Sequence, residues 1–219
     1  MKQLIINNKK SFDDFNVYIG ERTITPPTKK IIKETVPFSN DVYDYSKLDG
    51  EIYWNEATLT YVFDIAELTT EQMEVVKSNL LTWLSNVHDD DIYDPYIGDY
   101  HYHGSYDSCS WEEDFGAGKL TVDFLVYPYK IANNETQFSH TLTSGTNNIS
   151  VVNNGSHRIT PTFICSENMA IQIGTIVYSL PSGTTKDDSV KLDVGTNNLI
   201  VTPTSEGATL TIRFVEEVF

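Results

Sequence analysis

Two short segments carry the residue types that could do chemistry, an aspartate run and a pair of histidines. Asp89-Asp90-Asp91 with Asp94 could bind calcium, but an EF-hand loop beginning at Asp89 would need glycine where Asp94 stands and glutamate where Tyr100 stands. His101 and His103 would share one strand face as half of a zinc site, yet no cysteine or third histidine stands directly beside them. The sequence therefore favours a solvated acidic loop and partly exposed strand histidines, with no metal or other cofactor.

Motifs of covalent or phosphate chemistry are missing from the sequence. It contains no Gly-x-Ser-x-Gly, no phosphate-binding Gly-rich loop and no His-Glu-x-x-His. The 31 acidic residues leave a glycosidase pair arithmetically possible, but nothing singles out two of them. We therefore expect that the protein is not an enzyme.

Charge and composition narrow the remaining classes of protein function. A net charge of −16 repels phosphate backbones and anionic lipid surfaces, so we expect neither specific nucleic-acid binding nor membrane binding. No apolar run approaches a membrane span, and the three-residue run near the N-terminus is too short for a signal-peptide core. Cys109 and Cys165 are interpreted as free thiols, which predicts folding in a reducing cytoplasm.

The composition changes near residue 130, which predicts domains over residues 1–130 and 131–219. The first part holds 11 basic and 23 acidic residues, a net charge of −12, and all three tryptophans. The second holds 4 basic and 8 acidic residues, a net charge of −4, and is rich in Thr, Ser, Asn, Gly, Val and Ile. The predicted fold is mainly β, with an N-terminal α+β domain and a C-terminal β-sandwich of jelly-roll or galectin-like type.

One helix is predicted in the first domain, against a mostly antiparallel sheet or split barrel. Thr69 and Gln72 form a capping box, and an apolar stripe follows at helical spacing. The stripe consists of Met73, Val76, Leu80, Trp83 and Val87. The expected strands are Lys2–Asn7, Asn16–Ile19, Lys30–Val36, Ala57–Ile65, Asp99–Cys109 and Lys119–Pro128.

Short β-rich runs separated by turn clusters predict the second domain to be a sandwich. Gly-Thr-Asn-Asn occurs at 145–148 and again at 195–198, each time before a β-rich segment, so we expect one turn structure used twice. The expected strands are Ile149–Val152, Ile159–Cys165, Ala170–Tyr178, Ser189–Val194, Leu199–Pro203 and Thr209–Val215.

Residues 34–65 combine acidic turns with six aromatic residues in 24 positions, and end in the alternating strand Ala57–Ile65. Each ring can bury roughly 150–250 Å², so such rings are rarely left in water. Burial within a small β core of the same chain is the interpretation that ordinary burial habits favour. Burial of part of this surface against another protein chain is the alternative.

Several segments together carry a resemblance. They are Val36-Pro-Phe-Ser-Asn, Val42-Tyr-Asp-Tyr-Ser-Lys-Leu-Asp-Gly-Glu, Leu59-Thr-Tyr-Val-Phe, the helix from Thr69, Leu120-Thr-Val-Asp-Phe-Leu-Val-Tyr-Pro-Tyr, Gly195-Thr-Asn-Asn-Leu and Thr209-Leu-Thr-Ile-Arg-Phe-Val-Glu-Glu. Their order along essentially the whole chain resembles that of siphophage distal tail proteins. The resemblance implies a structural protein of the virion tail tip, without catalytic residues. It implies a hexameric ring built by the N-terminal domain, which joins the tail tube protein to tail-associated, fibre or receptor-binding proteins while DNA passes through.

Two sets of residues are assigned to that ring as hypotheses. The subunit interface would include Lys9, Lys10, Tyr43, Tyr45, Trp54 and Trp111. The acids Asp89, Asp90, Asp91 and Asp94 would line the channel, where negative charge repels the duplex and keeps it moving. The alternative function is a carbohydrate-binding module of a bacterial surface or secreted protein.

Overall fold

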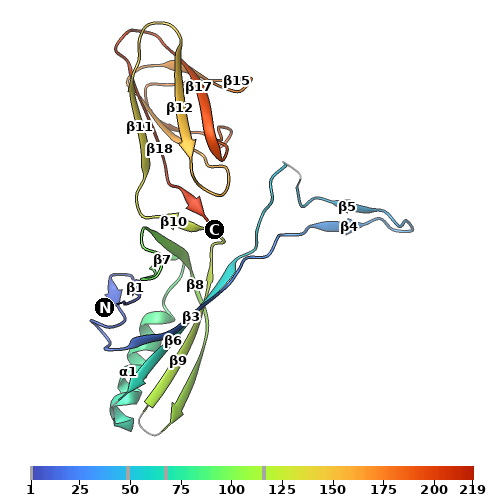
Figure 1. Ribbon diagram of the computed structural model, residues 1–219. Coiled ribbons are helices and arrows are strands. Elements are labelled where there is room, and N and C mark those ends of the chain that lie inside the picture. Colours follow the sequence, from blue (N-terminus) through green and yellow to red (C-terminus); the bar gives the residue numbers. More distant parts are fainter. Residues whose placement is uncertain (1, 48–49, 67–68, 115–116) are drawn as a thin grey trace. The chain divides into compact units, whose positions relative to one another are not determined.

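The computed structural model describes residues 2–47, 50–66, 69–114 and 117–219, and they form two compact units (Figure 1). One unit is Met1–Lys130 and the other is Ile131–Phe219. In the described residues both units are built from antiparallel strands, and a single α-helix belongs to the first. The mainly β fold class predicted from the sequence is confirmed.

A single antiparallel sheet forms the body of the first unit. Its strand order is β2, β1, β7, β8, β9, β6, β3. The bounds in that order are Lys9–Lys10, Ile5–Ile6, Asp90–Tyr93, Tyr100–Asp114, Ala117–Val126, Ala57–Ala66 and Tyr18–Thr25. Alternate residues of β6 and β9, such as Leu59, Phe63 and Phe124, are fully buried, because one face of the sheet carries the core. The short strands β2 and β7 were not predicted.

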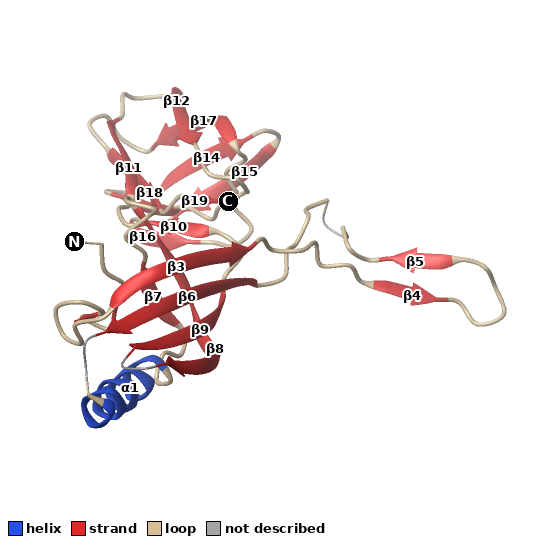
Figure 2. Cartoon of the chain, turned by 60° about the horizontal axis from the view of Figure 1, so that its bottom comes forward, coloured by secondary structure: helices blue, strands red, loops and turns tan. Residues whose placement is uncertain are grey.

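Helix α1, Thr70–Leu84, supplies the other side of that core (Figure 2). The predicted capping box is confirmed: Gln72 N donates to Thr69 Oγ1 over 3.3 Å, and Thr69 N donates to Gln72 Oε1 over 3.0 Å. Met73, Leu80 and Trp83 are buried, as their spacing predicted. The Trp83 indole N–H also donates to the Ile6 carbonyl over 3.2 Å, which joins the helix to β1.

The chain between β3 and β6 leaves the sheet as a separate hairpin. Strands β4 (Lys33–Thr35) and β5 (Val42–Asp44) pair only with each other among the described residues. The pairing continues beyond them: Lys30 N donates to the Tyr53 carbonyl over 2.8 Å, and Tyr45 N to the Ile32 carbonyl over 2.9 Å. Both views show this hairpin extending away from the sheet (Figures 1 and 2). We call residues 29–54 the arm; Leu48 and Asp49 lie outside the described residues.

The second unit is a sandwich of two four-stranded antiparallel sheets. One sheet has the order β11 (Thr136–Thr141), β18 (Thr209–Phe214), β13 (Thr162–Cys165), β16 (Gly183–Lys186). The other has the order β12 (Asn147–Asn153), β17 (Gly195–Pro203), β14 (Met169–Ile173), β15 (Ile176–Leu180). Alternate residues of both sheets, including Val151, Ile171 and Leu210, fill the core between them. The short strand β10 (Lys130–Ala132) pairs with β19 (Glu217–Val218).

The repeated Gly-Thr-Asn-Asn forms the same turn twice, as predicted. Asn147 Nδ2 donates to the carbonyls of Thr143 and Gly145, and Asn197 Nδ2 donates to those of Asp193 and Gly195. Both glycines have positive φ, 86° for Gly145 and 89° for Gly195, a backbone region that favours glycine. The strands that follow, β12 and β17, are neighbours in one sheet.

Two of the predicted strands were wrong in detail. Ala170–Tyr178 is two strands, because the chain turns at Gly174, whose φ is 59°. Ser189–Val194 makes a single bridge, between Leu192 and Ile159, in place of a strand. Buried Val190 and Leu192 explain the apolar pattern, since a loop that lies over the core shows the same alternation as a short strand.

Candidate assembly surface

The arm carries the largest group of exposed apolar side chains in the described part of the first unit. Phe38 at its tip is fully exposed, and Tyr43 is 60% exposed. The other exposed members are Ile31, Ile32, Val42, Tyr45, Ile52 and Tyr53. An isolated two-stranded hairpin is marginally stable in water, and clustered exposed apolar groups mark sites of protein interaction. Among the described residues the arm has no core of its own, so the interpretation of a local β core is wrong for residues 31–47 and 50–53.

Three of the six predicted interface residues lie on the arm. Tyr43 lies on β5 and Tyr45 directly after the end of that strand, with ring centroids 6.3 Å apart. Trp54 stands at the base of the arm, where it bridges to Lys29, whose Nζ lies 5.9 Å from the indole ring. Phe38 was not assigned to the interface by the sequence. It lies at the turn between β4 and β5, where it adopts a positive φ of 62°, which is unusual for a bulky residue.

The other three predicted interface residues lie on different elements. Lys9 and Lys10 form β2, at the end of the sheet opposite β3, and Lys10 Nζ already pairs with Asp13 over 3.2 Å. Trp111 lies on β8, half-buried against the core, with Lys77 Nζ 5.0 Å from its ring. Much of the Trp111 ring is therefore used in packing within the chain.

The aspartate run forms the start of β7 and not only a loop. Asp90 Oδ2 accepts hydrogen bonds from His88 N and from Asn7 Nδ2, each over 2.9 Å. These bonds hold the pKa of Asp90 below its ordinary value, and the bond from the His88 amide contributes most. Asp89 adopts a positive φ of 57°, which turns the chain into the strand. A surface hollow of about 360 Å³ is lined by Asp89, Asp90, Asp91 and His103.

His103 ties the aspartate run to the neighbouring strand β8. Its Nδ1 lies 2.8 Å from Asp91 Oδ1, and its Nε2 lies 2.9 Å from Asp89 Oδ1. The hydrogen bond to Asp91 is the main reason that the pKa of His103 is raised above 6.5. His101 is buried, with Nε2 3.4 Å from the same Asp91, so its expected partial exposure was wrong. Within the described ranges no three His, Cys, Asp or Glu side chains are arranged so that they could hold a metal ion.

Asp94 does not belong to the exposed run. Its carboxylate is fully buried, and Arg22 Nε lies 2.5 Å from Asp94 Oδ2. Arg22 also donates from Nη2 to the Tyr102 hydroxyl over 3.0 Å. A carboxylate enclosed in this way cannot line a channel. The assignment of Asp94 to a channel surface is therefore corrected, while Asp89, Asp90 and Asp91 remain candidates.

The aromatic side chains of the second unit do not form a flat sugar-binding platform among its described residues. Phe163 and Phe214 are buried in the sandwich core, as their apolar neighbours in the sequence predicted. Phe138 and Tyr178 are partly buried against the same core, and Phe219, at 49%, is the one exposed aromatic ring among the described residues of this unit. A stacking platform needs an exposed ring face, so this arrangement disfavours the kind of carbohydrate module that binds through aromatic stacking.

The fold defines a class of mainly β proteins, with a helix-backed antiparallel unit, a projecting arm and a sandwich. The chain is similar to the crystal structure of the SPP1 Dit (gp 19.1) protein, described as a paradigm of the hub adsorption apparatus in phages that infect Gram-positive bacteria. The similarity covers 100% of both chains, with a TM-score of 0.72 and 15% sequence identity. No family model and no curated protein sequence matches the chain. The likeness to a siphophage distal tail protein, predicted from the sequence, is thus confirmed for the fold.

No helix in the described part of the chain could span a membrane. The only helix there, α1, is too short and too polar to cross a bilayer.

Proposed function

We propose that this protein is a structural component of the tip of a long non-contractile phage tail. In this role it forms a ring hub that joins the tail tube protein to the tail-associated, fibre or receptor-binding proteins. The observation that carries the proposal is the end-to-end match of fold to the SPP1 hub protein. The protein would be made and folded in the bacterial cytoplasm and would act without catalysis as part of the virion.

The proposed ring is a hexamer whose contacts are made by residues 1–130. The arm supports this, because its apolar side chains are exposed in the single chain. Burial of these side chains against a neighbouring subunit would stabilise the assembly. Ring contacts are heterologous, so the arm of one subunit would meet a different surface on the next. Tyr43, Tyr45 and Trp54 are the proposed contact residues of the arm.

Charge complementarity would orient the subunits. The first 33 residues contain seven basic residues, and no Lys or Arg occurs between Asn79 and Gly118. We place the basic edge around Lys9 against acidic sequence of the neighbour, with Asp89–Asp91 near the channel through which DNA passes. Exposed ion pairs contribute only about 0–1 kcal/mol each, so the expected effect is on orientation and salt sensitivity.

The oligomeric state tests the proposal. Size exclusion with light scattering should give a mass six times that of the 24.8 kDa chain, and negative-stain images should show rings. A double variant, Tyr43→Ser with Tyr45→Ser, should shift the protein to monomers without unfolding it. The matched control is Ile176→Ser with Val177→Ser, because these side chains are 56% and 63% exposed but belong to β15 of the second unit.

Two results would contradict the ring. A wild-type chain that stays monomeric at high concentration excludes assembly through this protein alone, and an arm variant that forms normal rings excludes the arm as the contact. The charge hypothesis is tested by ionic strength and by Lys9→Gln. Removing residues 1–10 is not a clean test, because Leu4 and Ile6 in that segment are fully buried in the core.

A further inference from the structure

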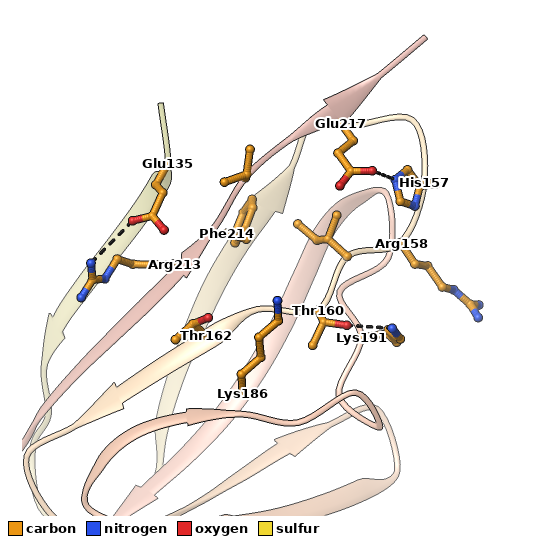
Figure 3. A pocket seen from close by; sticks show the side chains of 12 residues that line it. Glu135, His157, Arg158, Thr160, Thr162, Lys186, Lys191, Arg213, Phe214 and Glu217 are labelled. Atoms are coloured by element: carbon orange, nitrogen blue, oxygen red, sulfur yellow. Dashed lines mark hydrogen bonds and ion pairs between the residues drawn. The ribbon is translucent and has the colours of Figure 1, made fainter. Parts of the chain in front are cut away.

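The basic residues of the second unit all gather in one place. Residues 131–219 contain four Lys and Arg residues, and each of them lines a single pocket of about 320 Å³ (Figure 3). They are Arg158, Lys186, Lys191 and Arg213. The eight acidic residues of this unit contribute only Glu135 and Glu217 to the lining. In a chain of net charge −16, the pocket is thus a local site of positive charge.

Strand register explains how residues far apart in the sequence meet there. Thr162 on β13 lies directly opposite Lys186 on β16 and, on its other side, opposite Arg213 on β18. Directly opposed residues share a sheet face, so the three form a row across the outer face at one end of the sheet. Adjacent strands lie about 4.8 Å apart, which spaces the backbones of Lys186 and Arg213 by about 10 Å. The segment 157–160 and Lys191 close the other side of the pocket.

The cations of the pocket differ in how far they are neutralised. Arg158 Nε pairs with Asp193 over 2.5 Å, and Arg213 Nη1 lies 3.5 Å from Glu135. Lys191 Nζ donates to the uncharged Thr160 hydroxyl over 2.7 Å. Lys186 is exposed and has no ion-pair or hydrogen-bond partner in the described residues; Figure 3 shows its side chain reaching between Thr162 and Thr160. Four cations against the two lining carboxylates and the Asp193 carboxylate paired with Arg158 leave a local net charge of about +1, in accord with attraction of an anion.

One donor in the lining is left without a partner. Arg213 Nε is buried and, within the described part of the chain, has no acceptor for its N–H. A buried N–H without an acceptor is unfavourable, and a bound anion would supply that acceptor if the guanidinium of Arg213 turned toward it. The hydroxyls of Thr160 and Thr162 add polar groups that can bond to a ligand's oxygens.

We propose that this pocket binds a compact phosphate ester that carries hydroxyl groups, such as a polyol phosphate or sugar phosphate unit. Lys186, Lys191 and Arg213 would hold the phosphate oxygens by charge-assisted hydrogen bonds. Glu135 lies 3.5 Å from Arg213 Nη1, and Glu217 Oε2 lies 2.6 Å from His157 Nε2 (Figure 3). Each carboxylate keeps further lone pairs that would accept bonds from the ligand's hydroxyls. The volume lies at the small end of the range for ligand pockets, which fits a ligand of this size.

An acidic peptide of a partner protein is a poorer fit to the same surface. The two lining carboxylates would repel its side chains, and a peptide would need an extended groove or a free strand edge. The proposal is independent of ring assembly, because every residue of the pocket belongs to the second unit.

Titration calorimetry on the full-length chain tests the proposal with glycerol 1-phosphate, inorganic phosphate, glycerol and hexaglutamate as separate probes. Glycerol 1-phosphate should bind more tightly than inorganic phosphate, glycerol alone should not bind, and added salt should weaken binding. Lys186→Gln should weaken binding by about tenfold or more, because one charge-assisted bond is lost. Thr162→Val, which keeps the side-chain shape, should weaken it less.

The matched control is Lys119→Gln, which removes one charge from an exposed lysine of β9 in the first unit and should leave binding unchanged. A polymer of glycerol phosphate distinguishes the source of the ligand: tighter binding than the single ester indicates a surface polymer, and equal binding per unit indicates a free ester. Failure of glycerol 1-phosphate to bind, preferential binding of hexaglutamate, or equal loss in both lysine variants would overturn the assignment.

Discussion

The arm and strand β6 come from one aromatic segment of the sequence but differ in how far their side chains are buried. In β6, Leu59, Tyr61 and Phe63 are fully buried, whereas in the arm Phe38 is fully exposed and Tyr43 is 60% exposed. Strand β6 pairs with β3 and β9 and lies over the shared core; β4 and β5 pair only with each other among the described residues. Aromatic content alone therefore does not distinguish a segment that is buried within the chain from one that stays exposed in it.

The largest contrast is expected in stability. Phe63→Ala should lower the free energy of unfolding by about 3–5 kcal/mol, because it removes a fully buried ring from the core. Phe38→Ala should change it by less than about 0.5 kcal/mol, since that ring makes no core contact in the single chain. Urea unfolding at a protein concentration that keeps the chain monomeric measures both. Equal losses in the two variants would mean that the arm is part of the folded core.

A smaller contrast is expected between two aspartates. Asp94→Ala should cost about 3 kcal/mol, because it leaves the Arg22 guanidinium without its buried partner. Asp89→Ala, at a side chain that is 79% exposed, should cost no more than about 1 kcal/mol, because it removes an exposed contact with His103 and places alanine at a positive φ. The same unfolding measurement, repeated at high salt, separates the two cases, because screening acts weakly on the buried pair. A loss in Asp94→Ala that vanishes at high salt would contradict its enclosure.

The smallest expected effect is the contribution of His103 to the pH dependence of stability. Its folded pKa lies above the unfolded value of about 6.5, so the protonated form is favoured by folding. The contribution is present in full below pH 6.5 and is lost as the pH rises through the folded pKa. At a partly exposed site it should stay below about 1 kcal/mol. His103→Asn should remove this part of the pH profile, while His88→Asn, at an exposed side chain, should retain it.

Local features of the chain were predictable because their causes lie within a few residues. The capping box needs only Thr69 and Gln72, and the repeated turn needs only a glycine and the asparagine two positions later. The alternation of Leu59, Tyr61 and Phe63 and the helical stripe from Met73 likewise identified the buried faces. These patterns, in their order, were also enough to indicate the fold of a phage tail hub protein.

The tertiary structure alone decided which distant residues meet and which surfaces stay open. Arg22 and Asp94 are 72 positions apart, and the four cations of the sandwich pocket extend from residue 158 to residue 213. Strand order and register bring them together, and no local spacing encodes either one. The exposure of the arm is of the same kind: its sequence is as aromatic as a core strand, but burial depends on a partner surface, and the single chain supplies none to residues 31–45 among those described.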